Sequence, residues 1–168
     1  MFKPALALIA LLPLLGCSGV ATPKLSIVDV RQDEHEPSGR RMMVVVKAEN
    51  LSDEQLPLRD ATYVVRLDGK EVFNGQRSPE STLRKWGVQE LHFPVALPAD
   101  RWPTTDVPVR YDISGSLVYL PPGKLNEILY DYHLLRPTAS FSGTGQVSLH
   151  APSQPVSSAV PDQPATGG

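Results

Sequence analysis

Apolar and polar residues alternate with a period of two through most of this chain, and this constrains the fold more than any other feature. The clearest case is Val107–Tyr119, where Val, Tyr, Ile and Leu alternate with Pro, Arg, Asp and Ser. Successive side chains of a strand point to opposite faces, so the pattern predicts strands with one buried and one wet face. Similar stripes or apolar runs occupy 25–30, 42–48, 61–67, 91–97, 128–134 and 138–149.

Turn-forming residues separate these segments. Asp68-Gly69 lies between Tyr63–Leu67 and Val72-Phe73, and an Asp-Gly pair between apolar runs is the strongest short hairpin signal. Pro37-Ser38-Gly39 and Pro121-Pro122-Gly123 mark two further turns. No helix of convincing length is indicated, since 124–129 allows one turn at most. Seven or eight short strands without helices predict an all-β fold, an antiparallel β-sandwich of two sheets.

The first sixteen residues predict a signal peptide. Lys3 precedes an apolar run from Ala5 to Leu15, which is too short to span a bilayer. Leu14-Leu15-Gly16-Cys17 resembles the lipobox of bacterial lipoproteins, which implies cleavage after Gly16 and lipidation of Cys17. Ser18 favours the outer membrane over the inner one, with the protein facing the periplasm. The alternative is that Cys17, the only cysteine, is an idle thiol beside an uncleaved segment.

Composition divides the rest of the chain. We predict a lipidated tether over 17–23, a β-sandwich over 24–149 and a Pro/Ser/Ala-rich tail over 150–168. The tail carries four prolines and few large apolar residues, so it is predicted to be disordered. The formal net charge of −2 is spread along the chain, which excludes the basic footprint of a nucleic-acid binder.

The order of motifs from Val44 onward resembles the late-embryogenesis-abundant (LEA) type 2 family, also called the water-stress and hypersensitive-response (WHy) domain. The resemblance covers about 25–149 and implies an immunoglobulin-like β-sandwich, linked to stress or desiccation and lacking catalytic residues. The matching motifs are Val44-Val45-Val46 followed by Asn50, Leu56-Pro57-Leu58, Tyr63-Val64-Val65, Asp68-Gly69-Lys70, Val72-Phe73-Asn74-Gly75 and Tyr111–Leu117 with its central glycine.

No motif for catalysis or metal binding emerges. The four histidines, at positions 35, 92, 133 and 150, lack metal-ligand spacing, and no serine lies in a nucleophile elbow. Asp131 and His133 would share one face of a strand. They are interpreted as a surface pair, and the alternative is that Asp131 orients the imidazole of His133. Gly143-Thr144-Gly145 lacks the features of a phosphate loop and is interpreted as a strand bulge. We therefore predict no catalytic residues, no metal, no cofactor and no small-molecule substrate.

Two tryptophans suggest a binding patch. Trp86 follows Arg84-Lys85 and Trp102 follows Arg101, and aromatic residues beside arginine are enriched at contact sites. If the two loops share one end of the sandwich, they would form a patch for a protein, glycan or headgroup. In the alternative, each tryptophan closes an open end of the core.

The leading hypothesis is a non-enzymatic lipoprotein of the cell envelope that supports tolerance of water loss or envelope stress. The second is an adaptor or pilot subunit that binds a protein partner in an envelope assembly, since exposed strand edges can accept a partner's strand. An enzyme with a site assembled from distant residues is the third.

Overall fold

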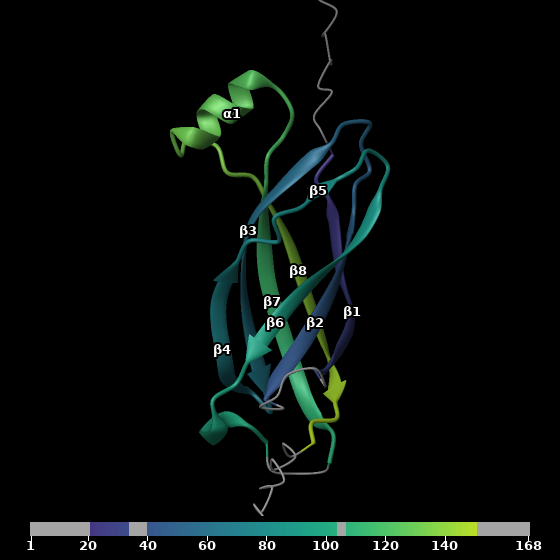
Figure 1. Ribbon diagram of the computed structural model, residues 1–168, viewed down its shortest axis with the longest axis vertical. Helices are drawn as coiled ribbons and strands as arrows, with labels where there is room; N and C mark the ends of the chain where they lie inside the picture. The colour runs from purple at the N-terminus through teal and green to yellow at the C-terminus, as the bar shows by residue number, and fades with distance from the viewer. Residues whose placement is uncertain (1–20, 34–39, 104–106, 151–168) are drawn as a thin grey trace, which may run out of the picture.

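The computed structural model describes residues 21–33, 40–103 and 107–150, which form eight strands, one short α-helix and one turn of 3₁₀-helix (Figure 1). The predicted all-β sandwich is confirmed. Its strands are β1 (Lys24–Gln32), β2 (Arg41–Glu49), β3 (Leu56–Leu67), β4 (Lys70–Arg77), β5 (Thr82–Leu83), β6 (Val88–Ala96), β7 (Val109–Tyr119) and β8 (Thr138–Val147). The helices are α1 (Lys124–Asp131) and η1 (Ala99–Arg101).

The strands form two antiparallel sheets whose long axes run along the molecule (Figure 1). One sheet has the order β1-β2-β6, and the other has the order β4-β3-β7-β8 with β5 paired to the start of β3. Strands β1 and β8 lie against each other and close one side of the sandwich. The opposite side is bordered by the edge strands β4 and β6.

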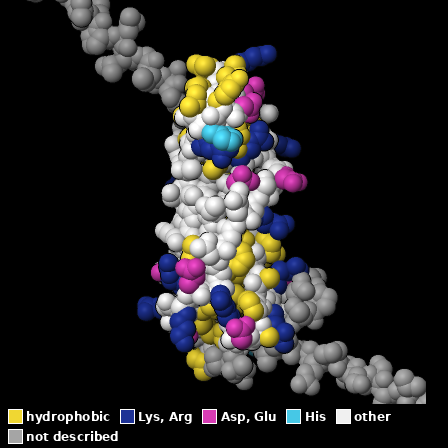
Figure 2. Space-filling model, turned by 90° about the vertical axis from the view of Figure 1, so that its left-hand side faces the viewer, with side chains coloured by type: hydrophobic (Ala, Val, Ile, Leu, Met, Phe, Trp, Pro, Cys, Tyr) yellow, Lys and Arg dark blue, Asp and Glu magenta, His cyan; other side chains and the backbone are white. Residues whose placement is uncertain are grey.

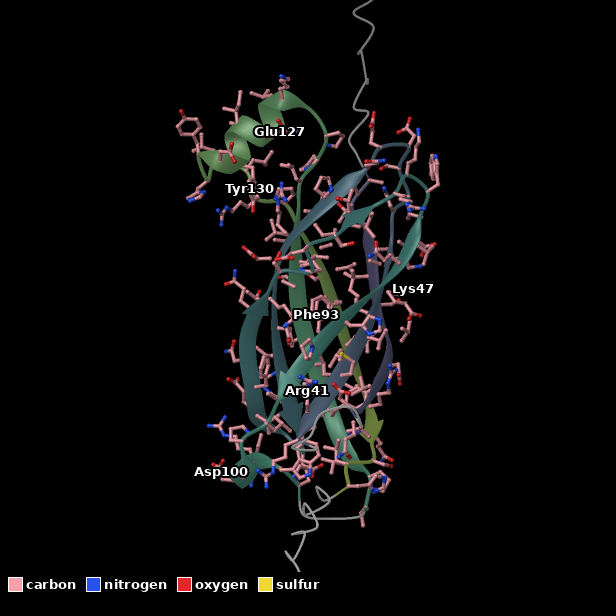
Figure 3. All side chains as sticks on the ribbon, viewed as in Figure 1. Arg41, Lys47, Phe93, Asp100, Glu127 and Tyr130 are labelled. Carbon is pink, nitrogen blue, oxygen red and sulfur yellow. The ribbon has the colours of Figure 1, made fainter. Side chains whose placement is uncertain are left out.

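The core lies between the sheets and is built from the predicted stripes. Val44, Val46 and Ala48 of β2 are completely buried, as expected. Phe93 lies near the centre of the core (Figure 3), with its ring centroid 5.3 Å from that of Tyr63 and 5.8 Å from that of Phe141. These rings join the two sheets, because β6 carries Phe93 whereas β3 and β8 carry its neighbours.

The Asp68-Gly69 hairpin is also confirmed. Both residues have positive φ, 47° and 79°, which is the geometry of a type I′ turn and matches the twist of the paired strands. The Asp68 side chain accepts a hydrogen bond of 3.2 Å from the backbone N–H of Arg110, so the turn is fixed to the start of β7.

Glycines in β7 and β8 mark close approaches rather than bulges. The predicted bulge at Gly143–Gly145 is wrong, because β7 and β8 pair through these residues without a change of register. A Cβ atom at Gly145 would lie 2.6 Å from the Tyr111 hydroxyl, so the ring crosses the space that a side chain would fill. At Gly115, a Cβ atom would lie 2.8 Å from the backbone oxygen of Thr62.

The strand predicted at 128–134 is wrong, because the segment belongs to α1 and the turn that follows it. Its apolar residues also fit a helical spacing, since Leu125, Ile128, Leu129 and Tyr132 fall at i, i+3, i+4 and i+7. Periodicity does not separate helix from strand in so short a segment. The eighth strand is instead β5, which has two residues and leaves no stripe in the sequence.

Several predictions lie outside the described residues. These are the signal peptide over 1–16, the lipidation of Cys17, most of the tether and the tail after His150. Within the ranges that the structure describes, no helix is both long and apolar enough to cross a membrane.

Candidate functional site

The described histidines lie in three separate places. His92 is exposed on β6, His133 follows α1, and His150 bonds through its backbone to the side chain of Gln32. Among residues 21–33, 40–103 and 107–150, no group of three His, Cys, Asp or Glu side chains is arranged to hold a metal ion.

The predicted pairing of Asp131 and His133 on one strand face is wrong, because α1 ends at Asp131. His133 adopts a left-handed conformation with φ of 61°. Its Nδ1 lies 2.8 Å from the guanidinium of Arg136, and the side chain is exposed. This neighbour is a cation, so the imidazole lacks the carboxylate partner that would orient it as a general base.

Tyr63 is a strongly perturbed titratable group. Burial raises its pKa to about 12, opposed in part by the charge of Arg77. Its hydroxyl donates a hydrogen bond of 2.7 Å to the carbonyl of Pro94, which ties β3 to β6 across the sandwich. A buried phenol that donates to a backbone carbonyl has a structural role, and its raised pKa follows from that burial.

Trp102 closes one end of the core. Its side chain is 5% exposed, and its indole N–H donates a hydrogen bond of 3.0 Å to the backbone oxygen of His150. The neighbouring Arg101 approaches the carbonyl of Val72. The interpretation of this tryptophan as a plug of the core is confirmed, and it also fixes the chain where the described residues end.

Trp86, by contrast, is exposed. Its side chain is 67% accessible, and its backbone is left-handed with φ of 53°, a conformation that is uncommon for a bulky residue. The loop is nevertheless well fixed, since the N–H of Trp86 donates to the carbonyl of Ser52 at 3.0 Å. Non-glycine residues held in this region often mark functional positions.

The structure does not bring the two tryptophans together. Trp86 with Arg84 precedes β6, whereas Arg101 with Trp102 follows it. Nine residues of strand at roughly 3.3 Å each separate the two loops by about 30 Å. They lie at opposite ends of the sandwich, as the places of β5 and η1 in Figure 1 show. A single patch of Trp86, Trp102, Arg84 and Arg101 is therefore wrong.

The sequence did not single out β6 as an open edge. Asn50 N–H donates to Gly87 O, and Leu97 N–H donates to Arg40 O, so odd-numbered residues of β6 bond to β2. Even-numbered residues turn their backbone groups outward. Pro94 has no N–H to offer there, which is typical of an edge strand. Within the described chain, no backbone bond reaches the outer side of Glu90 or His92.

A shallow groove of about 570 Å³ runs along this edge. Residues 77–80, at the end of β4 and just after it, form one wall, and residues 89–92 of β6 form the other. The groove has the position that an additional strand beside β6 would occupy. Its openness and its polar lining distinguish it from an enclosed pocket for a small molecule.

The sequence matches no protein-family model and no curated protein. Solved structures do match. At2g46140.1, a protein described as late embryogenesis abundant, has a TM-score of 0.60 and 18% identity over 79% of this chain and 74% of that one. AT1g01470 from Arabidopsis thaliana has a TM-score of 0.55 and 16% identity, over 79% of this chain and 85% of that one. The chain has an LEA/WHy-type fold.

The LEA-type sandwich presents distinct features at its open edge and at its two ends. Its described part contains an open strand edge at β6, an exposed tryptophan at one end and a core-closing tryptophan at the other. This arrangement suits contact with a macromolecule or a membrane.

Proposed function

We propose that this protein is a non-enzymatic lipoprotein of the bacterial cell envelope that supports tolerance of water loss or envelope stress. The observation that carries the proposal is the LEA-type fold, which extends over 79% of the chain. In this role a rigid, hydrophilic domain is held near the membrane and its proteins by the lipid on Cys17, and the domain limits their damage when water is withdrawn.

The anchor is supported by the sequence Leu14-Leu15-Gly16-Cys17 and by the absence of any other cysteine in the chain. Lipid on Cys17 gives stable attachment, because several acyl chains each add about 0.8 kcal/mol per buried methylene. Labelled palmitate should enter the wild-type protein and should be lost from Cys17→Ser. Labelling that persists in this variant would contradict the anchor.

Survival under osmotic stress tests the role itself. A strain that lacks the protein should survive an osmotic upshift or drying less well than the parent. Wild-type protein should restore survival, and Cys17→Ser, produced at the same level, should restore it incompletely. Equal survival of the deletion strain and the parent would contradict a protective function.

The open edge of β6 favours a second candidate function, an adaptor that binds a partner strand. Backbone groups at Glu90 and His92 face the groove and could extend the sheet by main-chain hydrogen bonds. His92→Pro removes an outward donor while leaving the bonds to β2, and His92→Ala removes the side chain alone. An adaptor should lose its partner with the proline variant and keep it with the alanine variant.

A further inference from the structure

Helix α1 presents an apolar face that nothing in the described structure covers. The helix lies outside the two sheets at one end of the molecule (Figure 1), and none of its residues is buried. Figure 2 shows hydrophobic side chains gathered at this end. Four large apolar side chains of α1 and the turn after it are at least half exposed: Leu125 (67%), Ile128 (51%), Tyr132 (75%) and Leu134 (74%).

The orientation of α1 is fixed by its other side. The ring of Tyr130 lies near two guanidinium groups, with its centroid 5.8 Å from Arg59 Cζ of β3 and 5.1 Å from Arg136 Cζ. The Asn126 amide donates a hydrogen bond of 2.7 Å to the carbonyl of Pro122. The apolar stripe is therefore a surface of a positioned helix.

Trp86 lies at the same end of the sandwich. Strand β6 begins two residues after it, and β2 ends beside the β6 start, where Glu49 pairs with Val88. Leu51, in the adjoining loop, is also exposed. Backbone bonds between the 50–55 and 84–87 loops fix the backbone of Trp86, so the indole is carried at this end by a fixed loop.

The chain enters the domain at this end as well. The hydroxyls of Thr22 and Tyr119 are 3.2 Å apart, and Tyr119 is the last residue of β7 before the connection to α1. Cys17 precedes Thr22 by five residues, which reach at most about 18 Å when fully extended. A lipid on Cys17 would thus keep the α1 end close to the bilayer surface. His150, where the described chain ends, bonds to Trp102 at the other end.

We propose that the end of the sandwich formed by α1 and the Trp86 loop rests in the headgroup layer of the membrane that holds Cys17. The apolar face of α1 and the Trp86 indole insert at the boundary between headgroups and acyl chains. This inference rests on the proposed lipid anchor and adds an orientation, with the long axis of the sandwich rising from the bilayer.

The attraction is hydrophobic and depends on the anchor. Lys124 is outweighed by Glu127 and Asp131, so the helix itself has no net positive charge that would require anionic lipid. One short helix face and one indole are a small apolar surface, which binds a bilayer weakly by itself. The tether raises the effective concentration of this surface at the membrane and makes insertion favourable.

The two tryptophans provide the test, with one reporter at each end. The full lipidated chain is reconstituted in dioleoyl-phosphatidylcholine vesicles, with or without phosphatidylcholine brominated on its acyl chains. Trp102→Phe leaves Trp86 as the reporter, and Trp86→Phe leaves Trp102 as its matched control. Most of the Trp86 emission should be quenched and shifted to the blue, whereas Trp102 emission should be unchanged. If Trp102→Phe does not fold, wild type is compared with Trp86→Phe, and only wild type should be quenched.

The outcomes separate the anchor from the orientation. Protein that floats with the vesicles while Trp86 stays unquenched would overturn the orientation and leave the anchor intact. Protein that does not float would overturn the anchor and the inference together. Ile128→Asp should reduce Trp86 quenching severalfold, whereas Val107→Asp, an exposed apolar position before β7, should leave it unchanged. Equal Trp86 quenching in both variants would contradict the insertion of α1 into the membrane.

Discussion

A buried asparagine holds the loops at the Trp86 end, and its replacement by aspartate is the sharpest test of how that end is built. The Asn50 amide nitrogen donates hydrogen bonds to the carbonyls of Glu54 (2.7 Å) and Arg84 (3.0 Å). Its oxygen accepts from the backbone N–H (3.0 Å) and the hydroxyl (2.7 Å) of Ser52. Asn50 is therefore the common partner of both loops.

Asn50→Asp keeps the shape of the side chain and removes both donors. Two lost hydrogen bonds cost about 1–3 kcal/mol, and a buried carboxylate facing two carbonyl oxygens adds a desolvation cost. We expect a loss of about 3 kcal/mol in the free energy of unfolding at neutral pH, which lowers Tm by roughly 10 °C in a domain of this size. The loss should be smaller at low pH, where a protonated carboxyl can donate one bond.

Urea denaturation and thermal melting measure this loss, and hydrogen exchange locates it. Amide exchange should accelerate in the 50–55 and 84–87 loops before the strands are affected. Asn74→Asp is the control, because Asn74 is exposed and its side chain makes a long bond of 3.4 Å to Glu71. It should change stability by less than about 0.5 kcal/mol. Equal stability of the two variants would refute the role given to Asn50.

Three further predictions concern the core and the exposed loop. Gly115→Ala should lower the free energy of unfolding by about 1–3 kcal/mol, because the added methyl group would clash with the backbone oxygen of Thr62. Gly145→Ala should lower it by less, because there the methyl group would clash with the end of the Tyr111 ring. Equal losses in denaturant titrations would contradict this difference. Because the folded-state pKa of Tyr63 is about 12 against 10 unfolded, the unfolded state releases its proton first. Stability attributable to Tyr63 should therefore be constant below pH 10 and fall between pH 10 and 12, by at most about 1.4 kcal/mol per unit, with no such component in Tyr63→Phe. Trp86→Gly should leave the free energy of unfolding equal or higher by up to about 1 kcal/mol, because it relieves the left-handed conformation. A marked fall in Tm would contradict the strain at this position.

Much of the sandwich was predictable from the sequence because alternation determines which face of each strand is buried. The stripes of β3, β6 and β8 became the core, and Asp68-Gly69 formed the expected hairpin turn. The LEA resemblance, carried by motifs such as Tyr111–Leu117, agrees with the solved structures of similar fold.

The remaining features depend on tertiary placement. Trp86 and Trp102 have similar neighbours in the sequence, yet one is exposed and the other closes the core, because they lie beyond opposite ends of β6. The open edge of β6 follows from the sheet order, which one sequence does not specify. A signal for the loop anchor was available, since Asn50 followed two residues later by Ser52 is the spacing of an Asx turn.

Crosslinking in living cells, followed by identification of the attached proteins, tests most directly whether this domain is a general protectant of the envelope. A general protectant should be crosslinked to a broad set of envelope proteins, and this set should grow under osmotic stress and be unchanged by His92→Pro. A single stoichiometric partner that is lost with His92→Pro and retained with His92→Ala would contradict it and identify the protein as an adaptor.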